Sequence, residues 1–274
     1  MENLDLDIKY IKTDKSEIPQ LPLMLEGVIP RHPSSCLFSG GTGSGKTNLI
    51  VNLLTRPEFY KDYFDVIFYF CGSSDCLFET IGIPEQNIFY DNFEENINFI
   101  LETQNEIIKE NQIQKSPKIL IVLDDLISNK KLLNTKAVKT LFIKNRHYNI
   151  STWITTQSFC EVPRVNRLQC QNIFFFKGTL SEQKRISEEF CAGGKSINEM
   201  YDIINKATCE DYSFLFINTF NKPNERYRKN FKEIFLNKIS DKHTIIMGIN
   251  TERMINNSLK TYNSMVILDN KLNL

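Results

Sequence analysis

The chain has 274 residues, of which 41% are hydrophobic and 11% aromatic, and its 33 basic and 33 acidic residues give a net charge of zero. This content is enough to bury the core of one large domain. Zero net charge gives no overall field that attracts nucleic acid or a membrane, so any such surface must be local. The sequence begins without the basic and apolar regions of a signal peptide, and no apolar run approaches the roughly eighteen residues of a membrane span. We therefore expect an untargeted soluble protein.

The cysteine pattern gives no framework of disulfides. Seven cysteines are scattered along the chain, several of them inside apolar segments: Cys36, Cys71, Cys76, Cys160, Cys170, Cys191 and Cys209. An odd number in such positions predicts buried, unpaired thiols in a reducing compartment. The one near pair, Cys71 and Cys76, lacks a second pair or a nearby histidine, so the spacing does not predict a zinc site.

The predicted elements alternate along the chain after an irregular, proline-containing lead-in at residues 1–30. Strands are predicted at 34–40, 64–72, 118–125, 150–157, 171–178 and 212–219, and helices at 46–55, 93–111, 134–149 and 181–192. Strands that are apolar on both faces and separated by helices predict a mainly parallel central sheet with helices on both faces, an α/β fold. We predict one domain over 31–235 and a C-terminal extension over 236–274, which is rich in asparagine and weak in pattern.

The segment GGTGSGKT lies directly after the first predicted strand and before the first helix. It fits the phosphate-binding pattern G-x-x-x-x-G-K-[ST] through Gly40, Gly45, Lys46 and Thr47. The nucleotide-binding residues are then Gly40, Gly41, Thr42, Gly43, Ser44, Gly45, Lys46 and Thr47. Glycines let backbone N–H groups turn inward around a phosphate, which also meets the positive end of the helix. Lys46 would reach the β- and γ-phosphates and Thr47 would bind Mg²⁺; the alternative is a glycine-rich turn that contains a lysine by chance.

A pair of acids follows the apolar run at residues 119–123. Asp124 and Asp125 stand where this strand emerges at its carboxyl end, the edge at which ligands bind in such sheets. This is a Walker B pattern, in which Asp124 would hold Mg²⁺ through water and Asp125 would be the general base for the attacking water. The alternative is an acidic pair that only opens a loop after a core strand.

The next predicted strand ends in Gln157. A polar amide at this position could contact the γ-phosphate or its water and sense whether the phosphate is present. A loop residue without function is the alternative.

Four segments together resemble the viral DNA-packaging ATPases of the FtsK/HerA superfamily, the poxvirus-type enzymes of large DNA viruses and virophages. The segments are GGTGSGKT, ILIVLDDL, RHYNISTWITTQ and PRVNRLQCQNIFFF, and the similarity covers roughly residues 30–220. The resemblance implies a RecA-like, additional-strand P-loop ATPase that uses ATP and Mg²⁺, forms a pentameric or hexameric ring and drives double-stranded DNA into a preformed capsid. It also implies capsid or portal-vertex proteins as partners, and the host cytoplasm or the virion as location.

The distribution of basic residues gives a separate indication of a surface for nucleic acid. Residues 126–181 contain nine basic residues against one acid, Glu161: Lys130, Lys131, Lys136, Lys139, Lys144, Arg146, Arg164, Arg167 and Lys177. Such a cluster could face a phosphate backbone through sequence-independent, salt-sensitive contacts. The alternative is the solvated face of a helix.

Ring ATPases commonly complete the site with an arginine from the neighbouring subunit, which stabilises charge on the γ-phosphate. Arg146 is our first candidate, and Arg164 and Arg167 are the alternatives.

Two other functions stay open: another P-loop ATPase, such as a helicase-like or AAA-type remodeller, and a nucleotide-switched assembly protein. The absence of a recognisable second RecA-like domain disfavours the first, and the paired acids disfavour the second.

Overall fold

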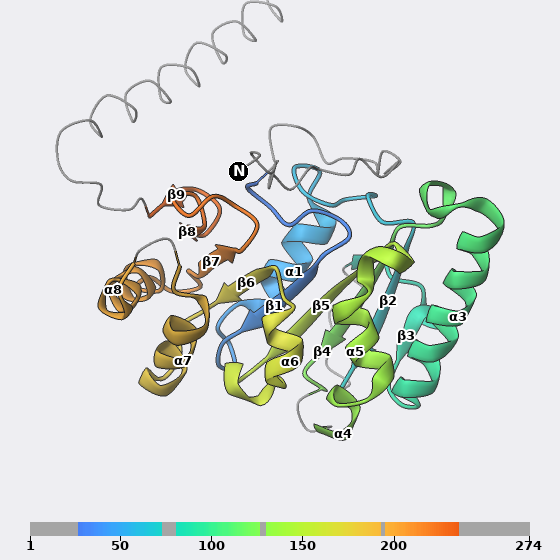
Figure 1. Cartoon of the computed structure of the whole chain (residues 1–274), viewed down its shortest axis with the longest axis horizontal. Helices are drawn as coiled ribbons and strands as arrows, with labels where there is room; N and C mark the ends of the chain where they lie inside the picture. The colour runs from blue at the N-terminus through green and yellow to red at the C-terminus, as the bar shows by residue number, and fades with distance from the viewer. Residues whose placement is uncertain (1–26, 73–80, 127–129, 193–194, 236–274) are drawn as a thin grey trace, which may run out of the picture. The chain divides into compact units, whose positions relative to one another are not determined.

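The computed structural model describes residues 27–235, apart from 73–80, 127–129 and 193–194. Within these residues one sheet runs through the molecule, with strand order β3-β2-β4-β5-β1-β6-β7-β8-β9 (Figure 1). The six strands from β3 to β6 are parallel, and β7, β8 and β9 continue the sheet in antiparallel order. The expected mainly parallel sheet is therefore confirmed.

The bounds of the strands follow the apolar runs of the sequence. They are β1 Ser35–Ser39, β2 Val66–Cys71, β3 Ile88–Phe89, β4 Ile119–Asp124, β5 Ile150–Thr156, β6 Asn172–Phe175, β7 Leu215–Asn218, β8 Tyr227–Lys229 and β9 Glu233–Ile234. Every residue of β1, β4, β5, β6 and β7 is buried, as expected for strands covered on both faces.

Helices cover both faces of the sheet. They are α1 Lys46–Thr55, α3 Phe93–Asn111, α4 Lys130–Leu133, α5 Lys136–Ile143, α6 Arg164–Leu168, α7 Leu180–Phe190 and α8 Ile197–Ala207. The helix α1 lies on one face, whereas α3, α5, α7 and α8 pack on the other (Figure 1).

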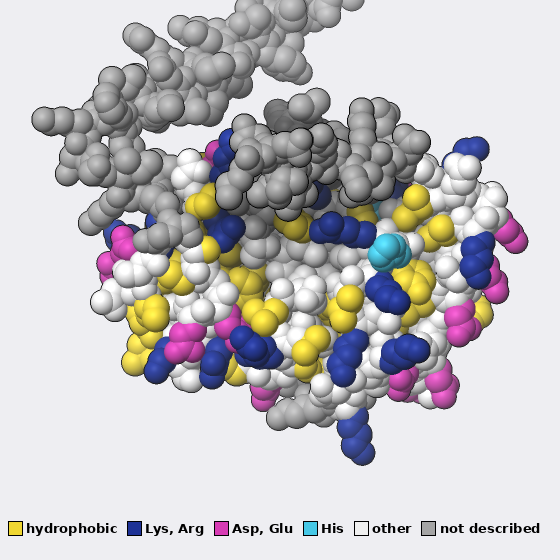
Figure 2. Space-filling view, viewed as in Figure 1, with side chains coloured by type: hydrophobic (Ala, Val, Ile, Leu, Met, Phe, Trp, Pro, Cys, Tyr) yellow, Lys and Arg dark blue, Asp and Glu magenta, His cyan; other side chains and the backbone are white. Residues whose placement is uncertain are grey.

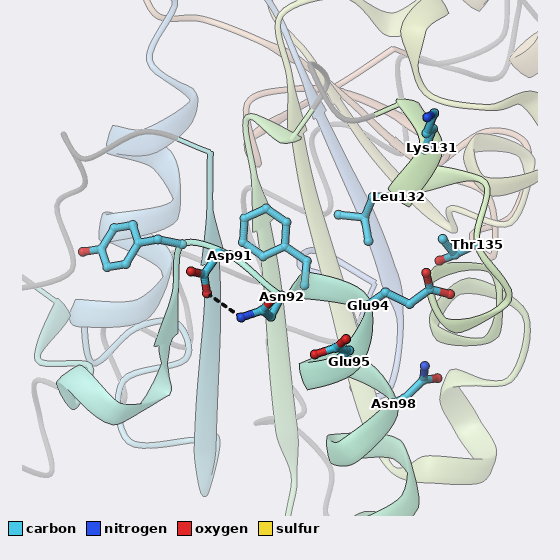
Figure 3. Close-up of a pocket in the computed structure, with 10 residues that line it drawn as sticks. Asp91, Asn92, Glu94, Glu95, Asn98, Lys131, Leu132 and Thr135 are labelled. Carbon is cyan, nitrogen blue, oxygen red and sulfur yellow. Dashed lines mark hydrogen bonds between the residues drawn. The ribbon is translucent and has the colours of Figure 1, made fainter.

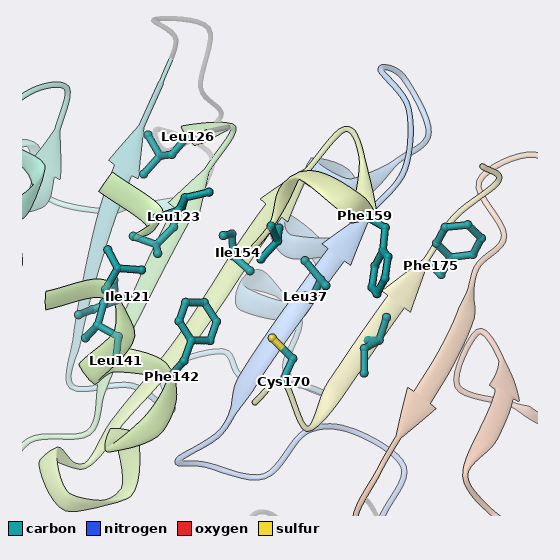
Figure 4. Close-up of a cluster of buried hydrophobic side chains, with 14 of the residues drawn as sticks. Leu37, Ile121, Leu123, Leu126, Leu141, Phe142, Ile154, Phe159, Cys170 and Phe175 are labelled. Atoms are coloured by element: carbon teal, nitrogen blue, oxygen red, sulfur yellow. The ribbon is translucent and has the colours of Figure 1, made fainter. Parts of the chain in front are cut away.

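Alternation along the strands divides the core into two layers. In β1, Leu37 joins the layer beneath α3, α5 and α7, and its neighbour Phe38 joins the layer beneath α1. Figure 4 shows the first layer, in which Ile121 and Ile154 lie on the sheet and Phe142 comes from α5. This two-sided burial holds the carboxyl ends of the parallel strands at one rigid edge.

The structure corrects the bounds of one predicted helix, adds a helix that was not predicted and shows the direction of the last predicted strand. The helix predicted over 134–149 ends at Ile143, and a 3₁₀ turn, Asn145–Tyr148, leads into β5. The helix α8 was not predicted, although Ser196 and Glu199 form a capping box at its start. The last predicted strand is antiparallel to its neighbour β6.

The cysteines follow the prediction only in part, because Cys160 and Cys209 are exposed and not buried. Five of them are free thiols: Cys36, Cys160, Cys170, Cys191 and Cys209. Cys71, at the end of β2, is disulfide-bonded, so the expectation of unpaired thiols is wrong at this position. Of the predicted lead-in over 1–30, residues 1–26 lie outside the described residues, as does the predicted extension over 236–274.

Candidate nucleotide site

The P-loop connects β1 to α1 at the carboxyl edge of the sheet. Gly43 and Gly45 have positive φ angles of 75° and 102°, which L side chains rarely adopt. Gly40 is required for another reason, because a Cβ atom there would lie 2.6 Å from Cβ of Phe176 and 2.8 Å from Oγ of Ser44. The glycines of the motif are therefore set by backbone conformation and by close packing.

Lys46 folds back over the loop. Its Nζ donates to the carbonyl oxygens of Gly40, at 2.5 Å, and Gly41, at 3.0 Å. Partial burial lowers the pKa of this ammonium group, and the charges of Asp125 and Asp124 oppose the shift. The positive charge thus lies within the field of both acids.

Ser44 supplies a buried hydroxyl to the same loop. Its Oγ has no hydrogen-bond partner within the described part of the chain. Buried polar atoms are nearly always paired in folded proteins. The orphaned hydroxyl therefore fits a loop that is completed by a polar ligand.

Asp124 ends β4 and is only 9% exposed. Its two carboxylate oxygens accept hydrogen bonds from the hydroxyls of Tyr69 and Thr155, which belong to the two flanking strands. Burial and the negative charge of Asp124 raise the pKa of the Tyr69 hydroxyl, so it remains a donor. The carboxylate is held by its neighbours in one orientation.

Asp125 leaves the strand in a left-handed conformation, with φ of 51°. Its backbone N–H donates to Oγ1 of Thr155 at 3.0 Å, so Thr155 contacts both acids. The amide of Gln157 donates to the Asp125 carboxylate at 3.0 Å, and its carbonyl accepts from the hydroxyl of Thr42 at 3.3 Å. Gln157 thereby links the predicted base to the P-loop.

Strand pairing explains why these residues meet. The strand β5 lies between β1 and β4, and Ser39 pairs with Thr156 while Leu123 pairs with Ile154. The backbone N–H of Gly40 also donates to the carbonyl of Thr156 at 3.1 Å. The structure thus brings together Lys46, Asp124, Asp125 and Gln157, which lie far apart in the sequence.

Two contributors were missed by the sequence analysis, Tyr69 and Thr155. In the sequence, Tyr69 has the pattern of a core aromatic residue within β2, and Thr155 is one of several threonines in β5. Their contact with Asp124 depends on which strands are neighbours and on the register between them. The position of Thr155, two residues before Gln157 and so on the same side of the strand, was the one signal in the sequence.

The candidate arginines do not join this group. Arg146 is exposed in the 3₁₀ turn before β5, and its neighbour Asn145 donates to Oγ of Ser35, the first residue of β1. Arg146 therefore lies at the amino edge of the sheet, opposite the P-loop, where its guanidinium group is 5.1 Å from the ring centre of Phe220. It cannot act in the site of its own subunit.

The two alternative arginines, Arg164 and Arg167, differ in their exposure and their contacts. Arg167 is buried and makes two hydrogen bonds to Glu189, at 2.7 and 2.6 Å, and a third to the carbonyl of Val162. These contacts remove Arg167 as a candidate, because a guanidinium group locked inside its own domain cannot reach a neighbour. Arg164 is 72% exposed and lies 3.7 Å from Glu189.

The basic residues of 126–181 do not form one patch. Lys131, Lys136, Lys144, Arg146, Arg164 and Lys177 are exposed, and the side chain of Lys130 lies outside the described residues. Figure 2 shows basic side chains spread over the face that carries α5 and α6, with apolar side chains between them. Lys177 lies beside the P-loop, where it lines a cavity of about 400 Å³ together with residues 41–44 and 210–213.

A larger cavity, of about 670 Å³, opens between the start of α3 and the segment that holds α4 and Thr135, the residue before α5 (Figure 3). Asp91, Glu94 and Glu95 line it together with Lys131, and Asn92 donates to Asp91 at 3.2 Å. No residue of the P-loop or of the acidic pair borders it among those described. The sequence analysis assigned no role to these residues.

Asp124 offers a carboxylate at this edge of the sheet, and oxygen atoms are the ligands that Mg²⁺ prefers. Among the described residues, no three His, Cys, Asp or Glu side chains are grouped as a metal site. A cation held at Asp124 would therefore need further ligands besides such side chains, and the hydroxyl of Thr47 and phosphate oxygens are ligands that Mg²⁺ accepts. No helix in the described ranges is long and apolar enough to cross a membrane.

The chain is similar to proteins of several viruses. The model of a family described as Poxvirus A32 protein matches residues 29–257. Uncharacterized protein 015R of Frog virus 3 (isolate Goorha) is 24% identical over 211 residues, which cover 73% of this chain and 64% of that protein. Uncharacterized protein 075L of Invertebrate iridescent virus 6 is 24% identical over 236 residues, or 84% of this chain and 86% of that protein. The match thus spans less than two thirds of the length of 015R.

A solved structure shows the same fold. The genome packaging NTPase B204 from Sulfolobus turreted icosahedral virus 2, in complex with AMP, superposes with a TM-score of 0.51 and 14% identity. The superposition covers 72% of this chain and 96% of that chain. The expected P-loop α/β fold is confirmed by this likeness and by the strand order.

Proposed function

The chain belongs to the Poxvirus A32 protein family, and on that basis we propose that it is an ATP-hydrolysing motor that packages double-stranded DNA into a capsid. The observation that carries the proposal is the meeting of a P-loop, two acids and a glutamine at one sheet edge, with Gln157 linking Asp125 to Thr42. The similar fold of B204, a genome packaging NTPase, supports the same class of function.

In the proposed reaction the P-loop, residues 40–47, binds the triphosphate. Thr47 and Asp124 hold Mg²⁺, which when bound neutralises charge on the β- and γ-phosphates. Lys46 exchanges its bonds to the loop carbonyls for bonds to phosphate oxygens. Asp125 orients a water molecule and accepts its proton as the water attacks the γ-phosphorus and ADP leaves.

Gln157 is placed to report the state of this reaction. Its amide contacts the general base and its carbonyl contacts the P-loop, so a γ-phosphate entering between them would change both contacts. We assign it the role of sensor because it directly follows β5, which pairs with both β1 and β4.

The motor requires a ring and a DNA-binding surface. We assign Arg146 as the residue that completes the site of a neighbouring subunit, because it is exposed and lies away from its own P-loop. Lys131, Lys136 and Lys144, which are exposed on and beside α4 and α5, would contact the phosphates of double-stranded DNA without reading its sequence. We propose that the subunits form a pentamer or hexamer. This ring would act with capsid or portal-vertex proteins in the host cytoplasm.

Steady-state ATP hydrolysis with and without long double-stranded DNA, at low and moderate salt, tests this function. We expect DNA to stimulate hydrolysis, the stimulation to fade as salt rises, and Lys46→Ala to abolish turnover. Hydrolysis that is indifferent to DNA at both salt concentrations would reject DNA as the direct activator and leave an ATPase with another partner.

A further inference from the structure

The topology determines on which side of the P-loop the nucleotide base must lie. Asp124 ends β4, Asp125 follows it and Gln157 follows β5, and both strands lie on one side of β1. A triphosphate bound around the loop therefore directs its γ-phosphate toward β5. Its other end, with the ribose and the base, leaves toward β6, β7 and β8.

A cavity lies on that side. It has a volume of about 320 Å³ between the first two turns of α1 and the segments flanking β7 and β8, and it is bordered by Gly45, Asn48, Leu49, Tyr212, Asn230 and Phe231. Tyr212 also lines the 400 Å³ cavity beside the P-loop. Both cavities therefore meet at this one side chain.

Tyr212 is unusual in its exposure and its backbone. Its side chain is 70% exposed, and its φ angle is 61°, an uncommon conformation for a large residue. The ring lies against the loop, since a Cβ atom on Gly45 would come within 3.2 Å of Cδ1 of Tyr212. Strained conformations of this kind persist where the surrounding structure fixes them, and they cluster at ligand sites.

The inner wall of the cavity is apolar and well packed. Phe231 contacts the rings of Phe59, at 5.6 Å between centroids, and Phe214, at 5.5 Å. Phe214 is buried, and the backbone N–H of Phe214 donates to Asn230 at 3.1 Å, which fixes the segment after β8. Such a wall can accept a flat apolar surface without reorganising.

The rim of the cavity is polar. Asn48 and Asn52 lie on consecutive turns of α1, and the amide of Asn52 donates to the carbonyl of Asn48 at 2.8 Å. Asparagine side chains both donate and accept hydrogen bonds, as the edge of a nucleobase does. An apolar wall with a few amides at its rim is typical of a site for a small aromatic ligand.

We propose that this cavity binds the base of the nucleoside triphosphate and that the ring of Tyr212 stacks on it. The inference rests on the proposed function, because it needs a triphosphate on the P-loop. It adds a second binding element to that function, on the opposite side of β1 from the acids. Stacking of a base on an aromatic side chain contributes an affinity that depends on the ring and not on its hydroxyl.

The test compares two ligands that share the phosphates and differ in the base. ATP and inorganic tripolyphosphate are titrated against the full chain, Tyr212→Asn and Tyr212→Phe. Asparagine removes the ring and tolerates a positive φ angle, so the backbone can be kept. Tyr90→Asn is the matched control, because Tyr90 is 53% exposed and lines the cavity of Figure 3.

We expect Tyr212→Asn to weaken ATP binding about tenfold and to leave tripolyphosphate binding unchanged, while Tyr212→Phe and Tyr90→Asn bind both ligands as the unmodified chain does. Equal binding of ATP by Tyr212→Asn, or an equal loss of both ligands, would overturn the base site. Failure of the unmodified chain to bind either ligand would reject the nucleotide site as a whole. If Tyr212→Asn loses ATP binding alone and DNA does not change hydrolysis by the unmodified chain, the base site is supported and the motor is rejected.

Discussion

The side-chain amide of Gln157 donates to the carboxylate of Asp125 across 3.0 Å. The two residues are 32 positions apart in the chain, and they directly follow β4 and β5, which are neighbouring strands of the sheet. Because the other end of the same amide contacts Thr42, a single side chain connects the phosphate-binding loop with the proposed general base. The bonds of Lys46 to the loop do not involve Gln157, so the role of Gln157 in hydrolysis can be tested apart from nucleotide binding.

Replacement of Gln157 by alanine should slow hydrolysis by one to two orders of magnitude, because Asp125 loses the group that orients it. Nucleotide affinity should change by less than about threefold, since the P-loop bonds of Lys46 are independent of Gln157. Single-turnover hydrolysis and equilibrium titration measure the two quantities. Gln169→Ala, at an exposed glutamine after α6, is the matched control. A loss of affinity as large as the loss of rate would contradict the role of sensor.

Asp125→Asn should retain nucleotide binding and lose most turnover, by a factor of about 10² to 10⁴. Asparagine tolerates the left-handed conformation at this position, and its side-chain oxygen can still accept from Gln157. The substitution therefore removes the basic carboxylate and little else. Unchanged turnover would remove Asp125 as the base.

Tyr69→Phe should raise the Mg²⁺ concentration needed for half-maximal hydrolysis about tenfold, because Asp124 loses one of its two hydroxyl donors. A titration of activity with Mg²⁺ at fixed ATP measures the shift. Tyr60→Phe is the control, since the hydroxyl of that buried tyrosine donates to the carbonyl of Pro30, away from Asp124. An equal shift in both variants would indicate a loss of stability and not a loss of orientation.

Arg146→Ala should leave the nucleotide affinity of the isolated subunit unchanged, because Arg146 lies at the edge of the sheet opposite the P-loop. Hydrolysis by the assembled protein should fall by about 10³ or more if this arginine acts in a neighbouring site. Arg164→Ala tests the exposed alternative in the same assay. A weakened affinity in the subunit itself would place Arg146 in its own site and contradict the geometry.

Stability should fall as the pH is lowered from about 6.5 to 4, and His32 is the reason. Burial lowers the pKa of His32 to about 4, with a further contribution from Lys118, while its ring nitrogens bond Ser151 and Asn149. The unfolded chain binds this proton near its ordinary pKa of about 6.5 and the folded chain does not, so acid favours unfolding. The difference of about 2.5 pKa units corresponds to at most roughly 3 kcal/mol.

Denaturant unfolding at pH 7 and pH 5 measures this effect. His32→Asn should be less stable at pH 7 and should show a flatter dependence on pH than the unmodified chain. His147→Gln, at an exposed histidine, is the control variant. An unaltered slope in His32→Asn would assign the acid sensitivity to other groups.

Much of the fold could be predicted from local pattern. The helix predicted over 93–111 has the same bounds in the structure, because its apolar residues recur at helical spacing over five turns. The helix predicted over 134–149 was too long, since periodicity cannot distinguish the end of an α-helix from a 3₁₀ turn that continues it. The helix α8 was missed although it begins with a capping box and its buried residues, Met200, Ile203, Ile204 and Ala207, recur at helical spacing.

The sequence by itself determined the P-loop and the acidic pair, because each is a run of consecutive residues whose chemistry depends on backbone conformation and strand position. Only the tertiary structure decided that Tyr69 and Thr155 hold Asp124, that Glu189 holds Arg167, and that Arg146 lies away from its own P-loop. Contacts of this kind depend on which strands are neighbours and in which register they pair. A linear pattern predicts that a strand exists, but long-range packing selects the strand beside it.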